Sequence, residues 1–151
     1  MRTKTSGAAR AGKSRLSPPS SAPAPEPLPT ETVADVGTAM PAILATIRAV
    51  ESGGNYQAEA SGSSASGAYQ FIDGTWQSCP LAETGHAAYA SDRNQDSCAA
   101  WLVGRIWTDD HRLVAIPLRW YCPCPLDEVP GGNRLTPREY AERWLARWEE
   151  K

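Results

Sequence analysis

The sequence predicts a small, mostly α-helical domain with one minimal β element, preceded by a disordered N-terminal arm. Residues 1–30 of the 151-residue chain are almost all Ser, Ala, Pro, Thr, Gly and charged residues. All six Trp, all five Tyr and the single Phe lie in the remainder, where apolar residues recur at helical spacing. We therefore expect a disordered arm over residues 1–35 and one domain over residues 36–151, close to the common domain size.

The arm combines a basic start with a proline-rich end. The first 16 positions contain five basic residues and no acidic one, and residues 17–29 contain six prolines. Proline-rich chains favour extended polyproline II, which acts as a semi-rigid spacer. We expect a solvated tail, although a short basic arm can also touch anionic surfaces such as lipid headgroups, nucleic acid or cell-wall polymers.

The first helix is expected over residues 38–50. Pro41 suits its first turn, and Gly53-Gly54 ends it. Its apolar face consists of Ile43, Leu44, Ile47 and Val50. Glu51 therefore falls at the C-terminal end of a mostly buried helix.

The middle of the chain predicts a loop followed by further helices. Residues 52–67 are rich in Ser and Gly and indicate a loop, and residues 68–72 indicate a short strand or an irregular turn. Residues 73–76 resemble a turn into a short helix. A long helix is expected from about Asp92 to Trp107, and a shorter one over Leu113–Tyr121.

The last helix has the clearest beginning. Thr136 is placed to cap it, Pro137 occupies the first helical position, and Glu139 completes a capping box. An apolar face should pack this helix on the domain, and it consists of Tyr140, Trp144, Leu145 and Trp148.

Charge and hydropathy exclude several classes of protein. The net charge is −2, from 15 basic and 17 acidic residues, which argues against a general nucleic-acid-binding protein. No run of about 18 apolar residues is present, so no transmembrane segment is expected. No signal peptide is expected either, because no apolar segment follows the basic start.

The four cysteines permit two disulfides, and four cysteines allow three connectivities. Cys122 and Cys124 are expected to lie too close to pair comfortably with each other, so each would bond a distant partner, with Cys79 and Cys98 as candidates. A zinc site is the rival interpretation, but a lone Cys-x-Cys lacks the paired spacing of zinc sites. In a reducing compartment all four would stay free thiols.

No cofactor or metal site is predicted. Asp109, Asp110 and His111 are adjacent, but three consecutive residues rarely converge on one ion, so a solvated helix end is the preferred interpretation. His86 stands alone in a predicted loop. The sequence contains no Ser-His-Asp pattern, phosphate-binding glycine loop or zinc motif.

Glu51 is the leading candidate for catalysis. Cleavage of a glycosidic bond needs a proton for the leaving oxygen, and a glutamic acid can supply it near neutral pH if its pKa is raised. Burial against apolar side chains penalises the charged form, and the negative end of a helix acts in the same direction. From position alone, a glutamate that simply ends a helix in water is an equal alternative.

The residues that follow Glu51 form a longer pattern. Glu51-Ser52-Gly53-Gly54-Asn55-Tyr56 is followed by Ser61, Ala65-Ser66-Gly67, Gln70 and Thr75-Trp76. Over residues 42–76 the chain resembles the lytic transglycosylases and the resuscitation-promoting-factor-like domains of the lysozyme superfamily. In those families a Glu-Ser pair ends the first core helix and supplies the catalytic acid. The resemblance implies an α+β, lysozyme-like fold.

The resemblance also implies a reaction. Glu51 would protonate the β-1,4 bond between N-acetylmuramic acid and N-acetylglucosamine in peptidoglycan. It would then take the proton of the muramic C6 hydroxyl, which closes a 1,6-anhydro ring. Ser61 and Gln70 would position the sugar by hydrogen bonds.

The resemblance leaves the aromatic residues less determined. Tyr69, Phe71 and Trp76 could line a cleft, since sugars stack on aromatic rings, but core packing is the alternative and is favoured for Phe71. Many lytic transglycosylases carry a late Tyr in an Ala-Tyr-Asn-Ala-Gly-type motif that this chain lacks. Tyr121 is the nearest substitute.

Three other functions remain open at this stage. A hydrolytic muramidase would pair Glu51 with a second carboxylate, for which Asp73 and Glu59 are candidates. A non-catalytic peptidoglycan-binding module and a virion-associated component are the others. In each case we expect a monomer acting at the cell wall, reached by secretion, at the cell surface or by virion or lysis machinery.

Overall fold

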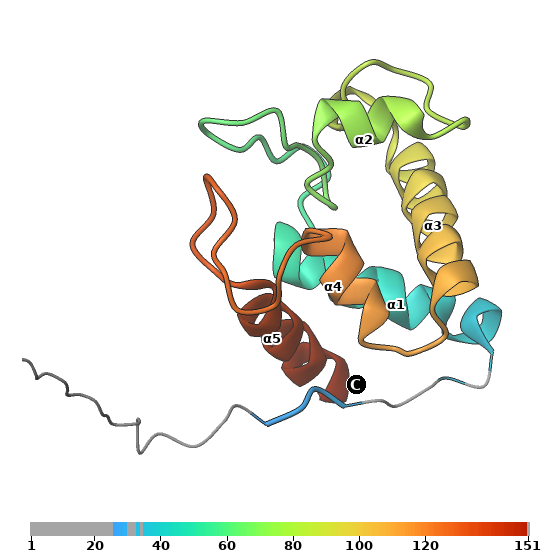
Figure 1. The fold of residues 1–151 in the computed structure, drawn as a ribbon. Coiled ribbons are helices and arrows are strands. Elements are labelled where there is room, and N and C mark those ends of the chain that lie inside the picture. Colours follow the sequence, from blue (N-terminus) through green and yellow to red (C-terminus); the bar gives the residue numbers. More distant parts are fainter. Residues whose placement is uncertain (1–25, 30–32, 34, 151) are drawn as a thin grey trace, which may run out of the picture.

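The computed structural model describes residues 26–29, 33 and 35–150. The basic arm and most of the proline-rich segment lie outside these residues, and so does the disorder predicted for them. The elements in chain order are α1 (Val36–Glu51), α2 (Asp73–Ser78), the 3₁₀ helix η3 (Ala87–Tyr89), α3 (Asp92–Asp109), α4 (Ala115–Tyr121) and α5 (Pro137–Glu149). The described part of the chain is mostly helical, as predicted (Figure 1).

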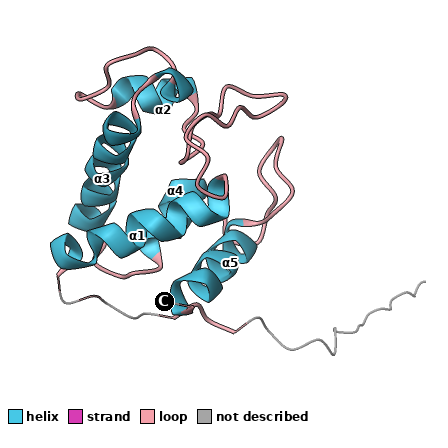
Figure 2. Cartoon of the chain, turned by 180° about the vertical axis from the view of Figure 1, so that it is seen from behind, coloured by secondary structure: helices cyan, strands magenta, loops and turns pink. Residues whose placement is uncertain are grey.

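The helices pack around α1 and α4. Helix α1 contacts α3 and α5, and α4 contacts the same two helices. The loop between α1 and α2 and the loop between α4 and α5 project from the same side of the molecule (Figures 1 and 2). Large side chains with almost no exposure fill the core between the helices: Ile43, Ile47, Val103, Ile116 and Trp144.

The ends of two helices show how local capping decides their length. Thr136 and Glu139 form the predicted capping box at the start of α5. Helix α1 begins before the predicted residue 38, because the Asp35 carboxylate accepts a hydrogen bond from the Gly37 backbone N–H at 3.0 Å. Pro41 therefore lies inside the helix rather than in its first turn, which corrects the prediction.

The segment after α1 is a turn-rich loop held by isolated β-bridges. Glu59 pairs with Ser66, and Ser66 pairs with Phe71, both antiparallel, so the minimal β element is present without a full strand (Figure 2). Gly67 adopts φ +81°, and a Cβ at this position would lie 2.4 Å from the Gln95 Oε1 atom. Only glycine allows both this backbone conformation and this close approach.

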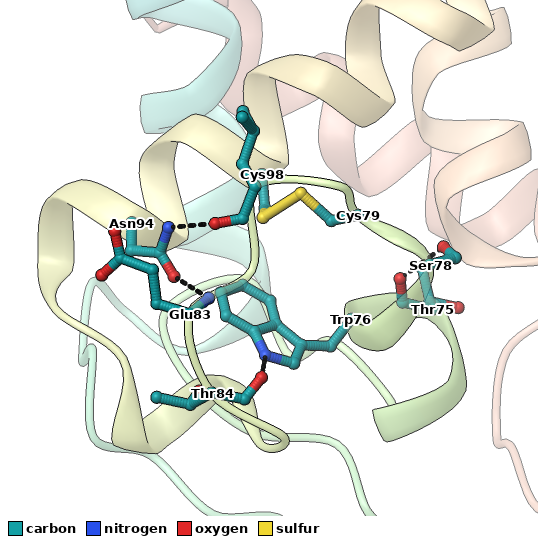
Figure 3. Close-up of a disulfide and its surroundings, with 9 residues drawn as sticks. Thr75, Trp76, Ser78, Cys79, Glu83, Thr84, Asn94 and Cys98 are labelled. Atoms are coloured by element: carbon teal, nitrogen blue, oxygen red, sulfur yellow. Dashed lines mark hydrogen bonds between the residues drawn. A yellow bond between two sulfur atoms is a disulfide. The ribbon is translucent and has the colours of Figure 1, made fainter.

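Two disulfides connect neighbouring cysteines rather than the expected distant pairs. Cys79, just after α2, bonds Cys98 in α3, with their Cα atoms 5.8 Å apart (Figure 3). Cys122 bonds Cys124, with Cα atoms 5.2 Å apart. The prediction that these two are too close to pair is wrong, because their Cα atoms, two positions apart in the chain, are already separated by a distance within the usual disulfide range.

Candidate active site

Glu51 lies in a cleft of about 910 Å³ between the two projecting loops. The cleft is lined by residues 60–63 and 65 of the first loop, by residues 131–133 of the second, and by residues 119–123 at the end of α4. Glu51 is the last residue of α1, so its side chain reaches the cleft where the helix stops. The predicted position at the end of a buried helix is confirmed.

The surroundings of Glu51 favour its neutral form. Burial raises the pKa of its carboxyl from the ordinary 4.5 to about 7, while a hydrogen bond from Tyr140 acts in the opposite direction. A carboxyl with such a pKa is largely protonated below neutrality and can still ionise in the neutral range. Its protonation state can therefore change during a reaction near pH 7.

Tyr140 of α5 is the nearest polar partner of Glu51. Its hydroxyl donates a hydrogen bond to Glu51 Oε2, and the ring is 5% exposed. Burial, followed by the charge of Glu51, raises the pKa of Tyr140 well above its ordinary value, so this hydroxyl stays a donor. The sequence placed Tyr140 on an apolar packing face and gave no sign of this contact.

Tyr121 packs against Tyr140, and its hydroxyl binds a residue other than Glu51. The two rings stack at 4.5 Å with an interplanar angle of 18°. The Tyr121 hydroxyl donates to the Leu135 carbonyl oxygen at 2.7 Å, and the side chain also lines the cleft. Tyr121, the substitute for the late tyrosine suggested by the sequence, therefore lies at the cleft, while Tyr140 is the tyrosine that binds the Glu51 carboxyl.

Four of the predicted substrate-binding residues line the cleft. They are Tyr121, Ser61, Gln70 and Phe71. Gln70 has a φ of 52°, and its side-chain amide donates to the Gly67 carbonyl oxygen at 3.1 Å. Phe71 is only 4% exposed, so it belongs to the core as well as to the wall of the cleft.

Tyr69 and Trp76 do not line the cleft, which corrects the expectation for both. Each is 0% exposed. The Trp76 Nε1–H donates to the Thr84 carbonyl oxygen at 2.7 Å, which anchors the ring beside the Cys79–Cys98 disulfide (Figure 3). The ring that the sequence missed is Trp120, which is partly buried, lines the cleft and lies 5.3 Å from Phe71.

A partly buried polar cluster fixes Tyr69. Arg48 donates to the Tyr69 hydroxyl at 2.7 Å, and Tyr69 donates to Asp96 Oδ1 at 2.6 Å. Tyr56 donates to the same Asp96 oxygen at 2.6 Å. Because α1, the loop and α3 each contribute a member, this cluster holds the three segments in register.

Ser52 shows why a serine follows the glutamate. Its hydroxyl donates to the Ala68 carbonyl oxygen at 2.8 Å and accepts from the Asn55 backbone N–H at 3.0 Å. The Ala68 N–H in turn donates to the buried Gln95 side chain at 2.9 Å. These bonds tie the loop that follows Glu51 to its return segment and thereby shape the entrance to the cleft.

The two other carboxylates proposed from the sequence, those of Asp73 and Glu59, form hydrogen bonds with His86. Asp73 Oδ1 is 2.7 Å from His86 Nδ1, and Glu59 Oε1 is 2.7 Å from His86 Nε2. Hydrogen bonds to the carboxylates of Asp73 and then Glu59 raise the pKa of His86. His86 is therefore not alone in its loop, which corrects the sequence interpretation, and neither carboxylate lines the cleft.

The adjacent acidic residues after α3 form ion pairs. Asp110 binds Arg112 at 2.6 Å, and Asp109 binds Arg119 at 3.3 Å. Among the residues that the structure describes, no group of His, Cys, Asp and Glu side chains is arranged to hold a metal ion.

Comparison with known families agrees with this geometry. The family model of the transglycosylase-like domain matches residues 38–106. Residues 38–106 are therefore similar to a transglycosylase-like domain. No curated protein and no solved structure shows a significant match to the chain.

The transglycosylase-like segment covers only part of the site. It includes α2, nearly all of α1 and most of α3, and therefore Glu51, Ser61 and Gln70. Helices α4 and α5 lie beyond it and supply Trp120, Tyr121 and Tyr140. One wall of the cleft, and the hydrogen-bond partner of Glu51, thus come from residues after the matched segment.

Proposed function

We propose that this protein is a lytic transglycosylase that acts on peptidoglycan at the cell wall. It would cleave the β-1,4 bond between N-acetylmuramic acid and N-acetylglucosamine and leave 1,6-anhydromuramic ends. The observation that carries this proposal is Glu51, a carboxyl with a pKa of about 7 that lines the cleft. Within the described residues no helix is long and apolar enough to cross a membrane.

The first step uses the protonated form of Glu51. The carboxyl gives its proton to the glycosidic oxygen, and the bond from that oxygen to the muramic C1 breaks as the N-acetylglucosamine leaves. The N-acetyl group of the muramic acid can stabilise the positive charge that develops at C1. One carboxylate therefore suffices for this step.

The second step uses the ionised form that the first step leaves. Glu51 takes the proton of the muramic C6 hydroxyl, and the C6 oxygen forms a bond to C1. The acid is then regenerated without water entering the product. The hydrogen bond from Tyr140 stabilises the carboxylate between the two steps, since hydrogen bonds to charged groups are the stronger ones.

The lining of the cleft suits a neutral sugar chain. Ser61 and Gln70 offer hydrogen-bond partners for hydroxyl and acetamido groups. Trp120 supplies the aromatic surface on which a sugar ring can stack, in place of the buried Tyr69 and Trp76. The substrate would thus lie across the cleft between the two projecting loops.

A hydrolytic muramidase is the second candidate, and the distribution of carboxylates disfavours it. Glu51 is the only acidic side chain among the described residues that line the cleft. Asp73 and Glu59 are held by His86 outside the cleft. A classical hydrolase would place a second carboxylate across the sugar from the acid. A binding-only module is disfavoured too, because binding alone does not need a buried carboxyl.

The test is digestion of purified peptidoglycan by the wild type and by Glu51→Gln, with Glu142→Gln as a matched control on the exposed face of α5. We expect the wild type and Glu142→Gln to release soluble fragments, and Glu51→Gln to release almost none. Mass spectrometry should show muramic ends lighter by one water than hydrolysed ends. Equal release by wild type and Glu51→Gln would refute the catalytic assignment.

A further inference from the structure

A second cavity of about 400 Å³ lies beside Tyr140, the residue that binds the Glu51 carboxyl. Its lining residues are Val50, Tyr121, Arg134, Leu135, Tyr140 and Arg143. Val50 precedes Glu51 in α1, Tyr140 binds the Glu51 carboxyl, and Tyr121 lines both this cavity and the cleft. A ligand in this cavity would therefore contact residues that adjoin the cleft and the Glu51 carboxyl.

The cavity combines two positive charges with an apolar and aromatic wall. Neither Arg134 nor Arg143 has a hydrogen-bond or ion-pair partner among the described residues, whereas Arg48, Arg112, Arg119, Arg138 and Arg147 each pair with an acidic residue. No acidic side chain of the described residues lines the cavity. Glu139, about one turn before Arg143 on α5, accepts a hydrogen bond from the Thr136 backbone N–H at 2.9 Å.

We propose that this cavity binds a carboxylate of the peptide stem carried by the muramic acid. The inference rests on the proposed function, because it identifies a second part of the same substrate. Peptidoglycan presents two chemistries, a neutral sugar chain and short peptides that bear carboxylates. The stem is attached to the sugar whose C1 bond is cleaved, so it brings an anion close to Glu51.

The two cavities match these two chemistries. The cleft offers hydroxyl, amide and aromatic groups, which suit sugars, and Arg119 in it is already paired with Asp109. The second cavity offers two guanidinium groups, which bind carboxylates in a planar, two-point geometry. Its apolar wall, Val50 and Leu135, can cover the aliphatic part of a stem residue.

The test compares two forms of one substrate. Peptidoglycan freed of phosphate-containing wall polymers is used either intact or after an amidase has removed its stems. The variant is Arg134→Gln/Arg143→Gln, and the control is Arg147→Gln, which lies one turn further along α5, pairs with Glu150 and does not line the cavity. The preference is the ratio of kcat/KM on the intact substrate to kcat/KM on the stem-free one. We expect the wild type and the control to favour the intact substrate. In the double variant this ratio should fall about tenfold, mainly because KM for the intact substrate rises.

A binding measurement separates this inference from the proposed function. Glu51→Gln protein, with and without the two arginine changes, is sedimented with intact and with stem-free glycan. We expect the arginine changes to weaken binding to the intact glycan alone. If the wild type cleaves neither substrate while this difference in binding is seen, the stem site stands and the proposed function fails. If the arginine changes leave both the preference and the binding unchanged, or reduce binding equally on both glycans, the stem site is refuted.

Discussion

Replacing Glu51 with Gln should change how the stability of the protein depends on pH. The folded state raises the pKa of this carboxyl from 4.5 to about 7, so between these values the folded state binds the proton more tightly than the unfolded state. The stabilisation from that proton is fully present below pH 4.5 and is lost as the pH rises through 7. The difference corresponds to about 3 kcal/mol in total, at about 1.4 kcal/mol per tenfold change. Between pH 5 and pH 8, the contribution of Glu51 to the free energy of unfolding of the wild type should fall by about 2.5 kcal/mol.

Urea unfolding of wild type and Glu51→Gln at pH 5 and pH 8, with the disulfides intact, measures this loss. The glutamine does not ionise, and all other titrating groups are shared, so the free-energy difference between the two proteins isolates Glu51. From pH 5 to pH 8, the unfolding free energy of Glu51→Gln relative to that of the wild type should rise by about 2 to 3 kcal/mol. If the difference in unfolding free energy is the same at pH 5 and pH 8, Glu51 is not a buried acid with a raised pKa, and the reasoning fails.

Three further predictions concern the support of the site. Tyr140→Phe removes the bond that lowers the pKa of the catalytic carboxyl, so the high-pH limb of the rate profile should move upward while kcat falls about tenfold; an unchanged profile would contradict this. Gly67→Ala should lower the free energy of unfolding by at least about 1 kcal/mol, and Gly74→Ala, where a Cβ meets nothing within 4 Å, should change it little. Thermal and urea unfolding measure both variants, and an equal loss of unfolding free energy in the two would contradict this prediction. Replacing both Cys79 and Cys98 with Ala opens a link across 19 positions and should cost about 3 kcal/mol in the same assay; a loss below about 1 kcal/mol would count against it.

The sequence predicted the parts of the site that depend on local patterns. The helix that places Glu51 follows from the spacing of its apolar residues, and the capping box of α5 follows from Thr136 and Glu139. Ser61 and Gln70 were assigned by resemblance and line the cleft, since they lie on a short segment directly after Glu51.

The contacts that the sequence could not predict join distant segments. Tyr140 is 89 positions from Glu51, and on its own helix it falls on an apolar face that is indistinguishable from ordinary packing. His86 is 27 positions from Glu59, so its isolation in the sequence says nothing of its two carboxylate partners. Tyr69 and Trp76 carry polar atoms that form hydrogen bonds with Asp96 and with the Thr84 carbonyl oxygen, so these rings can enter the core at little cost.

Cleavage of peptidoglycan in water enriched with oxygen-18 tests the central claim most directly. If Glu51 acts first as acid and then as base on the substrate's own C6 hydroxyl, the new muramic ends should be 1,6-anhydro sugars that contain no oxygen-18. Reducing muramic ends that carry one oxygen-18 atom at C1 would show that water is the nucleophile, and would contradict the account.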